Sequence, residues 1–381
     1  MWNRRTSLKW EKKMDILKKA KPWVVASVLV AISGFAEQKN MNKNTPALAT
    51  PMPAPLTAAY NAPARVDVCG SWDVYADASF IYWQPTQDNS EFGISSSKAA
   101  AATANIFGTT ATPVSNYMVN LNTNYKPGFE IGLGLNFGSD NWDSCLQYTW
   151  FHNTNSNKFE AATGASVFPS RLQPGATGSA GSFDSANASW NLKMDLADWQ
   201  LGRSYYVGKK LTFRPFVGLR GAWIRQKYNT TYTRTSVEAS TVQIAERSTS
   251  WGLGAEAGMN ASFLLDWGFR LFGDVESDII YTRYKTNYSE EDVTGTQTMS
   301  LKQSKLAAVR PHANIDLGLG WGSYFYDNKC HFDLAASYGF QAFWDQNMFR
   351  HFTDTTATYN SQMPNGNLYV QGLNLTARFD F

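Results

Sequence analysis

Four histidines are the side chains of this sequence best suited to acid–base chemistry near neutral pH: His152, His312, His331 and His351. A hydrolase built around one of them would need a nucleophile, and no G-x-S-x-G motif accompanies them. The glycine-dense stretches "GLGLNFG" and "GLGLGWG" do not predict a phosphate-binding loop, because they lie inside expected strands and lack the helix start that such a loop requires. No metal-ligand spacing stands out. We therefore expect no catalytic residue, no metal, no cofactor and no enzymatic activity.

The segments that carry these residues alternate apolar and polar positions. In "GFEIGLGLNFG", the odd-numbered residues from Phe129 to Phe137 are apolar, whereas the even-numbered ones are small or polar. A period of two indicates a β-strand, and 9 to 11 such residues are enough to cross a bilayer. The same pattern recurs in about ten stretches: 72–82, 129–137, 146–150, 190–196, 211–223, 251–259, 269–279, 309–321, 332–344 and 373–381.

The connections between these stretches differ in length. Short polar turns at 138–141, 202–210 and 324–329 alternate with long Ser/Thr/Asn/Gly-rich segments at 84–124, 153–187, 226–249, 285–303 and 345–367. This asymmetry is typical of outer-membrane barrels, which have short periplasmic turns and long extracellular loops. We predict an all-β fold, a transmembrane antiparallel up-and-down β-barrel of about ten strands, with 10–12 compatible because 84–124 and 226–249 could hold further strands. A soluble β-sandwich fits less well, since its strands are shorter.

The chain ends inside a patterned stretch, "GLNLTARFDF". Terminal residues usually fray unless another element holds them, and an open strand edge in lipid leaves backbone groups without partners. We therefore expect the last strand to pair with the first and to close the barrel.

The N-terminal region predicts export. Basic residues precede an apolar run at 23–32, and Gly34, Phe35 and Ala36 offer a signal peptidase site. We expect a signal peptide at 1–36, with Met14 as an alternative start, then a Pro/Ala-rich periplasmic linker at 37–68 and the barrel at 69–381. A transmembrane anchor is the less favoured alternative, because the apolar run is shorter than a helical span. Cleavage would leave a slightly acidic chain without a basic aromatic patch, which argues against nucleic-acid binding.

Two stretches resemble a known family. "CGSWDVYADASFIYWQPTQD" (69–88) and "DLADWQLGRSYYVGKKLTFRPFVGLRGAWIRQKYN" (195–229) are similar to Legionella-type major outer membrane proteins, which include MOMP-like porins of environmental chlamydiae. The resemblance covers most of the chain after Cys69 and is most distinctive around Arg214-Pro215 and 218–221. It implies a porin in the outer membrane of a Gram-negative cell, in contact with outer-membrane lipid and passing small hydrophilic solutes. Phe379 and Phe381 resemble the C-terminal signal that the barrel assembly machinery reads.

The three cysteines should lie at the periplasmic rim, because Cys69, Cys145 and Cys330 each precede or begin an expected strand at that end. Three unpaired thiols, one bridge plus a free thiol, and links between chains all remain open. The resemblance implies disulfide cross-linking, to other envelope proteins or within a homo-oligomer.

Charged residues on the face opposite the apolar one are the candidate functional site. By this parity we predict that seven residues form a lumen selectivity site: Lys193, Arg214, Arg220, Glu256, Asp274, Glu276 and Asp316. The same parity points Glu130, Asp195, Arg270, Arg310 and Asp333 inward. Since acidic residues exceed basic ones near mid-depth, we predict passive diffusion with mild cation selectivity. The alternatives are a lumen filled by its own side chains, and a structural or adhesive barrel with a closed lumen whose long loops bind a host or cell partner.

Overall fold

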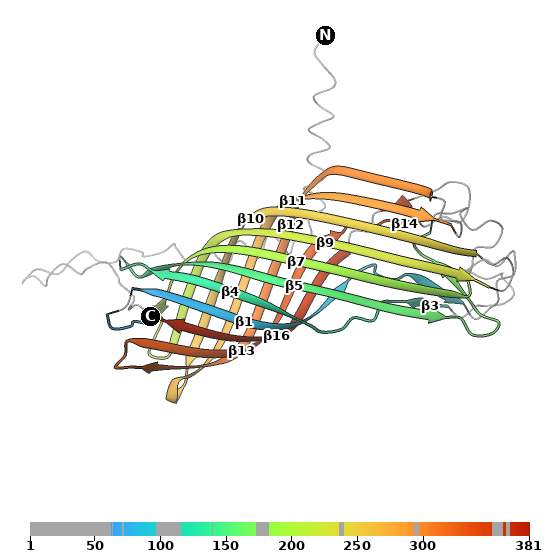
Figure 1. Ribbon diagram of the computed structural model, residues 1–381. Coiled ribbons are helices and arrows are strands. Elements are labelled where there is room, and N and C mark those ends of the chain that lie inside the picture. The colour runs from blue at the N-terminus through green and yellow to red at the C-terminus, as the bar shows by residue number, and fades with distance from the viewer. Residues whose placement is uncertain are drawn as a thin grey trace, which may run out of the picture. The chain divides into compact units, whose positions relative to one another are not determined.

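The computed structural model describes residues 62, 64–70, 72–96, 116–138, 140–172, 183–235, 240–292, 297–352, 361–362 and 366–381. In this part of the chain, ten long antiparallel strands form one closed sheet (Figure 1). They are β1 (Val74–Gln87), β4 (Lys126–Asn136), β5 (Trp142–Glu160), β7 (Ser185–Arg203), β9 (Leu211–Arg234), β10 (Ser240–Leu264), β11 (Phe269–Glu291), β12 (Gln297–Phe325), β13 (Cys330–Asn347) and β16 (Gly366–Asp380). Each pairs with the next along the chain, so the predicted up-and-down barrel is confirmed.

The first and last long strands close the barrel. β1 pairs with β16 in antiparallel register from Tyr75 opposite Asp380 to Gln87 opposite Leu368. The Phe381 N–H donates to the Val74 carbonyl at 3.1 Å, so pairing continues to the final residue. β13 holds the other edge of β16. The C-terminal strand therefore has partners on both sides, as a barrel wall in lipid requires.

The two ends of the barrel differ, and we call them the turn end and the loop end. The turn end holds the short connections 137–141, 204–210, 265–268 and 326–329, together with the C-terminus. In the first turn, Asp140 and Asn141 have φ of 61° and 58°, a left-handed conformation that Asp and Asn tolerate better than most residues. The connection 265–268 contains the short 3-10 helix η2 (Asp266–Gly268). In the connection 204–210, β8 (Tyr205–Tyr206) pairs antiparallel with the start of β9.

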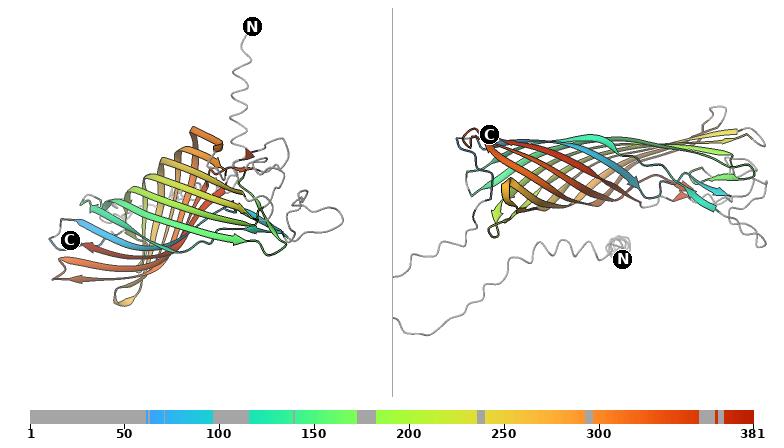
Figure 2. Two further views of the ribbon diagram at one scale, coloured as in Figure 1. Left: turned by 45° about the vertical axis from the view of Figure 1, so that its right-hand side comes forward. Right: turned by 90° about the horizontal axis from the view of Figure 1, so that it is seen from below.

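The loop end holds the connections 88–125, 161–184, 235–239, 292–296 and 348–365. Two predicted loops are wrong, because most of 226–249 and 285–303 continues as strand in β9 to β12. Their outward residues are polar, which gives a loop-like composition, but inward apolar residues such as Tyr228 and Ile244 alternate with them. β5, β7 and β9 to β12 therefore extend beyond the four shorter strands (Figure 2).

Segments from the loop-end connections pack against the inner wall. β2 (Gly93–Ser96), β3 (Asn116–Val119) and β6 (Ser166–Pro169) form a three-stranded sheet, while β14 (His351–Phe352) pairs with β15 (Ser361–Gln362). Phe92, Leu121 and Phe183 from these connections join barrel residues such as Trp190 and Ile224 in one apolar core. We call the segments 88–96, 116–125, 161–172 and 183–184 the plug.

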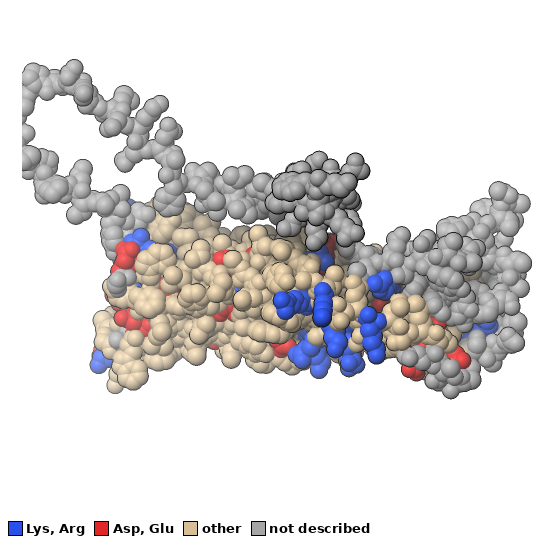
Figure 3. All heavy atoms as spheres, turned by 90° about the horizontal axis from the view of Figure 1, so that it is seen from above, with Lys and Arg blue, Asp and Glu red and all other residues tan. Residues whose placement is uncertain are grey.

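The outer wall is apolar around the turn end and the middle of the barrel. Large apolar side chains on it are about half exposed, including Leu133, Leu253, Val275 and Leu317. Figure 3 shows this wall as mostly uncharged, with a group of basic side chains nearer the loop end. Within the described residues, no helix has the length and apolarity to cross a membrane.

The predicted signal peptide (1–36) and the first part of the predicted linker (37–68) lie outside the described residues. The last part of that linker contacts the turn end. The Ala62 carbonyl accepts from the Tyr206 N–H at 2.9 Å, and the Ala64 N–H donates to the Ser204 carbonyl at 3.2 Å.

Candidate functional site

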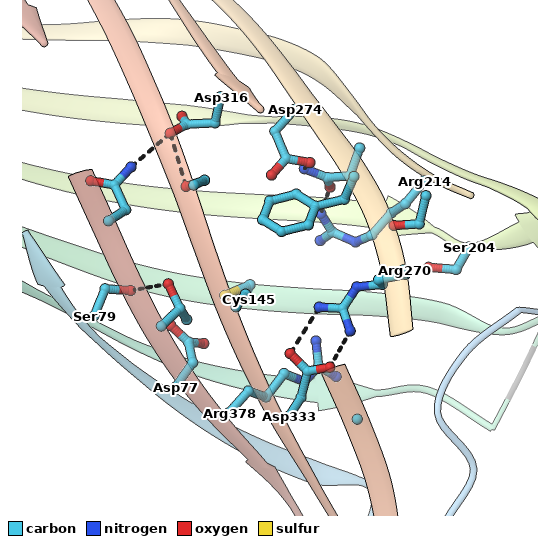
Figure 4. A pocket seen from close by; sticks show the side chains of 18 of the residues that line it. Asp77, Ser79, Cys145, Ser204, Arg214, Arg270, Asp274, Asp316, Asp333 and Arg378 are labelled. Carbon is cyan, nitrogen blue, oxygen red and sulfur yellow. Dashed lines mark hydrogen bonds and ion pairs between the residues drawn. The ribbon is translucent and has the colours of Figure 1, made fainter. Parts of the chain in front are cut away.

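A cavity of about 630 Å³ occupies the turn-end half of the barrel interior. It reaches from Arg65, Ser204 and Gly268 at the turn end to Trp83 and Leu196 deeper inside. Twelve charged side chains line it, and Figure 4 shows several of them converging from different strands. They are the carboxyl groups of Asp77, Glu130, Asp198, Asp274, Glu276, Asp316 and Asp333, and the guanidinium groups of Arg65, Arg214, Arg220, Arg270 and Arg378.

Three of the arginines are held by carboxylates on the wall. Arg214 Nη2 donates to Asp143 Oδ2 at 2.6 Å, and its Nη1 donates to Asn260 Oδ1 at 2.8 Å. Arg270 makes a two-pronged ion pair with Asp333. Arg378 pairs with Asp380. Because their charges are compensated, these arginines add little net positive potential to the cavity.

Arg220 lies at the inner end of the cavity, within a group of carboxylates. Its guanidinium donates to Asp198 Oδ1 at 2.6 Å, Asp278 Oδ2 at 2.8 Å and Glu276 Oε2 at 2.9 Å. A fourth carboxylate, that of Glu256, lies 3.8 Å away. One guanidinium therefore faces four carboxyl groups, and the side chains of β7, β9, β10 and β11 meet here.

His312 on β12 completes this group. Its Nδ1 lies 2.6 Å from Asp278 Oδ2, and its ring packs on that of Phe343 at a centroid distance of 4.0 Å. Phe343 belongs to the apolar core, so the Arg220 group lies at the boundary between the polar cavity and that core. His312 is buried inside the barrel.

Four cavity carboxyl groups form no ion pair within the described residues: Asp77, Glu130, Asp274 and Asp316. Asp274 on β11 lies directly opposite Asp316 on β12 in the strand register. Neutral amides support them, since Asn260 donates to Asp274 at 2.8 Å and Asn374 donates to Asp316 at 2.6 Å. Two ionised carboxyl groups placed opposite each other repel.

The plug is fixed by a buried arginine that no pattern in the sequence singles out. Arg171 is fully buried and donates from Nη1 to Glu246 Oε1 on β10 at 2.9 Å. It also donates to the Asn89 carbonyl at 2.8 Å, and its guanidinium lies 3.9 Å from the centre of the Tyr228 ring. Tyr232 Oη donates to the Phe92 carbonyl. These bonds join two plug segments to β9 and β10.

The structure places six of the seven predicted selectivity residues inside the barrel: Arg214, Arg220, Glu256, Asp274, Glu276 and Asp316. The prediction for Lys193 is wrong, because this residue is exposed on the outer wall, and Asp195 also faces outward, where it pairs with Arg225. Trp190, Leu192, Met194 and Leu196 point inward to the core instead of toward lipid.

Parity reasoning missed several interior charges: Asp77, Asp143, Asp198, Asp278, Arg378 and Asp380. One signal could have found Asp198. Up to Leu196, the large apolar residues of β7 stand at even-numbered positions, but the next one, Trp199, stands at an odd-numbered position and is exposed on the outer wall. Asp198, at an even-numbered position, therefore points inward.

The cysteines and the terminal aromatics lie as follows. Cys69 is exposed, and its N–H donates to the carbonyl of Asn328, two residues before Cys330 at the start of β13. Cys145 is also near the turn end, but its side chain is buried and lines the cavity. All three thiols are free, so cross-linking stays a prediction. Phe379 and Phe381 are partly exposed on the outer wall, and their assembly role stays a prediction as well.

Among the described residues, no three or more His, Cys, Asp or Glu side chains are grouped to hold a metal ion.

Comparisons with known proteins bear on the family and the location. The sequence profile described as "Legionella pneumophila major outer membrane protein precursor" matches residues 67–381. No curated protein gave a significant match to the sequence. The Escherichia coli outer membrane protease OmpT is 9% identical over 84% of this chain and 99% of its own, with a TM-score of 0.38. A major outer membrane protein from Thermus thermophilus is 11% identical over 80% of this chain and 99% of its own, with a TM-score of 0.29.

Likenesses this weak carry no argument about function. The profile match covers the whole barrel, and together with the closed sheet and its apolar outer wall it makes this chain a multi-pass barrel of the outer membrane. The turn end is then periplasmic and the loop end extracellular. The chain belongs to the family of the Legionella pneumophila major outer membrane protein.

Proposed function

We propose that this barrel is an outer-membrane channel through which small hydrophilic solutes and ions diffuse passively, with a preference for cations. The observation that carries the proposal is the charged cavity, where seven carboxyl groups face five guanidinium groups. A polar interior of this kind is typical of barrels that conduct, and rings of Asp or Glu favour cations.

The preference should come from the carboxylates that lack a basic partner. Glu256 and Glu276 both lie in the group around Arg220. Asp274 and Asp316 have only neutral donors and lie directly opposite each other. We propose that these two side chains, with Asp77 and Glu130, make the largest contribution to cation attraction.

The plug limits conduction. The apolar core and the Arg171–Glu246 pair occupy the extracellular half of the interior in the described residues. Ions that enter the periplasmic cavity would need the plug segments to move before they could pass. We therefore propose a gated channel with a low open probability, and we propose no catalytic role for it.

Planar-bilayer recording of the purified, folded barrel tests this function. We expect discrete channel openings and, in a salt gradient, a reversal potential on the cation side that moves toward zero as salt increases. A variant with a loosened plug, Arg171→Ala, should open more often. If neither the wild type nor Arg171→Ala conducts at voltages and salt concentrations at which known porins conduct, the channel proposal is rejected.

A second function has its own supporting observation. The apolar core that fills the extracellular half also fits a barrel that stays closed and presents its extracellular segments to a host or neighbouring cell. In that case neither the wild type nor Arg171→Ala would conduct, and adhesion of cells would depend on the segments between the strands. Recording and adhesion assays on the same variants separate the two functions.

A further inference from the structure

The outer wall carries a group of basic side chains near the loop end, visible in Figure 3. Six exposed residues from four neighbouring strands, β7, β9, β10 and β11, form what we call the basic face. They are Lys193, Arg225, Lys227, Arg247, Arg283 and Lys285. The exposed Lys302 on β12, opposite Asn287, continues the basic face onto a fifth strand.

The basic face begins where the apolar outer wall ends. On three strands the apolar stretch finishes with an exposed aromatic residue, and a basic residue follows within four positions toward the loop end: Trp223 then Arg225, Trp251 then Arg247, and Tyr281 then Arg283. Aromatic girdles of barrels lie at the membrane–water interface. The basic face therefore lies at the depth of the headgroups of the outer leaflet.

The positive charges of the basic face are poorly compensated. Lys193 lies opposite Arg225, and Lys227 lies opposite Arg247, in the strand register. Like charges placed directly opposite destabilise a sheet. Asp195 compensates Arg225 at 2.7 Å, whereas Lys193, Lys227, Arg247 and Lys285 form no ion pair within the described part of the chain. A bound anion would relieve this repulsion.

The basic face does not continue onto the strands that close the barrel. On β13, β16 and β1, the corresponding outward positions carry uncharged side chains such as Tyr338, Phe340, Tyr369 and Tyr82. A general requirement for positive charge near the headgroups would place basic residues on these strands as well. The one-sided arrangement is that of a binding surface.

We propose that the basic face binds the phosphate groups of an anionic glycolipid in the outer leaflet, of the lipid A type. Guanidinium groups pair with phosphate through two parallel N–H donors, and lysines add mobile point charges. Neighbouring strands are about 4.8 Å apart, so an opposed pair such as Lys227 and Arg247 can hold one phosphate between them. The acyl chains would lie along the apolar wall below Trp251 and Leu253. The proposal rests on the outer-membrane location and is independent of conduction.

The experiment compares two triple variants of the full folded barrel in neutral detergent. One variant removes three charges of the basic face, Lys227→Gln, Arg247→Gln and Lys285→Gln. The matched control removes three exposed charges at the turn end, Lys209→Gln, Lys210→Gln and Lys329→Gln. Binding of bis-phosphorylated lipid A, dephosphorylated lipid A, phosphatidylglycerol and inorganic phosphate is measured by titration, and folding is checked by heat-modifiable gel mobility.

We expect bis-phosphorylated lipid A to bind the wild type and the control equally, and to bind the basic-face variant at least tenfold more weakly, since each Lys or Arg at a charged surface contributes about 1 kcal/mol. Dephosphorylated lipid A should bind weakly, and inorganic phosphate should not compete at millimolar concentration. Equal binding of the two triple variants would overturn the proposal. So would tighter binding of phosphatidylglycerol than of bis-phosphorylated lipid A. If the triple variant does not fold, the single variants Lys227→Gln and Arg247→Gln should each weaken binding about fivefold, and unchanged binding in both would reject the proposal.

Discussion

The turn-end and loop-end halves of this barrel have opposite chemistry on their inner and outer faces. In the turn-end half of β10, Glu256 points inward while Leu253 and Met259 lie on the outer wall. In the loop-end half of the same strand, Ile244 points inward while Arg247 is exposed outside. The period of two continues without a break along the strand, but the apolar face changes from the outside to the inside.

This difference shows that alternating apolar and polar residues indicate a strand with one apolar and one polar environment. The alternation does not indicate whether the apolar environment lies inside or outside the barrel. Lipid surrounds the turn-end half, so the outer wall is apolar and the water-accessible cavity is charged. Where the strands leave the membrane, water is outside and the plug is inside, so the apolar side chains point inward. A parity assigned from one half is therefore wrong in the other, as Lys193 demonstrates.

The largest effect that would break this comparison is expected from Arg171→Ala. The substitution leaves the Glu246 carboxyl group buried without its cation, and removing one partner of a buried ion pair costs about 3–5 kcal/mol. We expect the plug to detach more often, which limited proteolysis within 161–184 and single-channel open probability both measure. The double variant Arg171→Met, Glu246→Met should restore much of the protection, because it removes both charges. Unchanged proteolysis in Arg171→Ala would mean that the plug is held by its apolar contacts alone.

The second effect concerns pH and acts on the same half. Burial, with the nearby Arg171 charge, lowers the pKa of His351 to about 3, although Glu91 lies 3.6 Å from its Nδ1. The detached plug exposes this imidazole, whose pKa then returns to about 6.5. The neutral ring therefore favours the docked plug fully above pH 6.5, and docking weakens by about 1.4 kcal/mol per pH unit as the pH falls from 6.5 toward 3.

We expect proteolysis of the plug to increase between pH 7 and pH 5, with about 2 kcal/mol of docking free energy lost at pH 5. The rate of plug cleavage by an acid-tolerant protease, measured at a series of pH values, tests this expectation. His351→Phe should show a flatter pH profile, because it removes this titration and leaves the other groups in place. A profile that is identical in the variant would assign the pH response to other residues.

A third, smaller effect tests the cavity in the turn-end half. Asp274→Asn with Asp316→Asn should lower the cation-to-anion permeability ratio at least fivefold, because each charge 4 Å from an ion in water contributes about 1 kcal/mol. Reversal potentials in a salt gradient measure this. Asp195→Asn on the outer wall removes the same type of charge and should leave the ratio unchanged. An equal shift in both variants would show that the cavity carboxylates do not line the ion path.

The architecture was predictable because it depends on local periodicity. Each of the ten long strands overlaps a predicted stretch, and barrel closure follows from the need to pair backbone groups in lipid. The predicted strand ends were less accurate. β9 extends to Arg234, well beyond the predicted end at Trp223. Its outward residues beyond Trp223 are polar because they face water, and this composition resembles that of a loop.

The candidate site was predictable only where the strand lies in the membrane. Arg214, Asp274 and Asp316 stand at positions that alternate with lipid-facing residues, so the sequence pattern correctly predicted that they point inward. The plug was not predictable, because Arg171 and Glu246 are 75 residues apart in the sequence and no periodic pattern relates a loop residue to a strand residue. Which carboxylates keep an arginine partner also depends on contacts across the barrel, as the four acids around Arg220 show.

The smallest effect should come from an arginine at the opposite end, Arg203→Ala. Arg203 donates to Asp140 Oδ1 at 2.8 Å and to its carbonyl at 3.0 Å, so on contacts alone it resembles Arg171. It differs in burial, because Arg203 and Asp140 keep 28% and 57% of their side-chain surface in solvent. Water then solvates either charge when the other is removed, and an exposed pair contributes about 0.5 kcal/mol or less. We expect unfolding in urea, followed by tryptophan fluorescence in detergent, to change within error for Arg203→Ala under conditions where Arg171→Ala loosens the plug. A comparable loss of stability in both would mean that the turn at 137–141 depends on Arg203 for its conformation, and that burial alone does not explain the difference between the two ends.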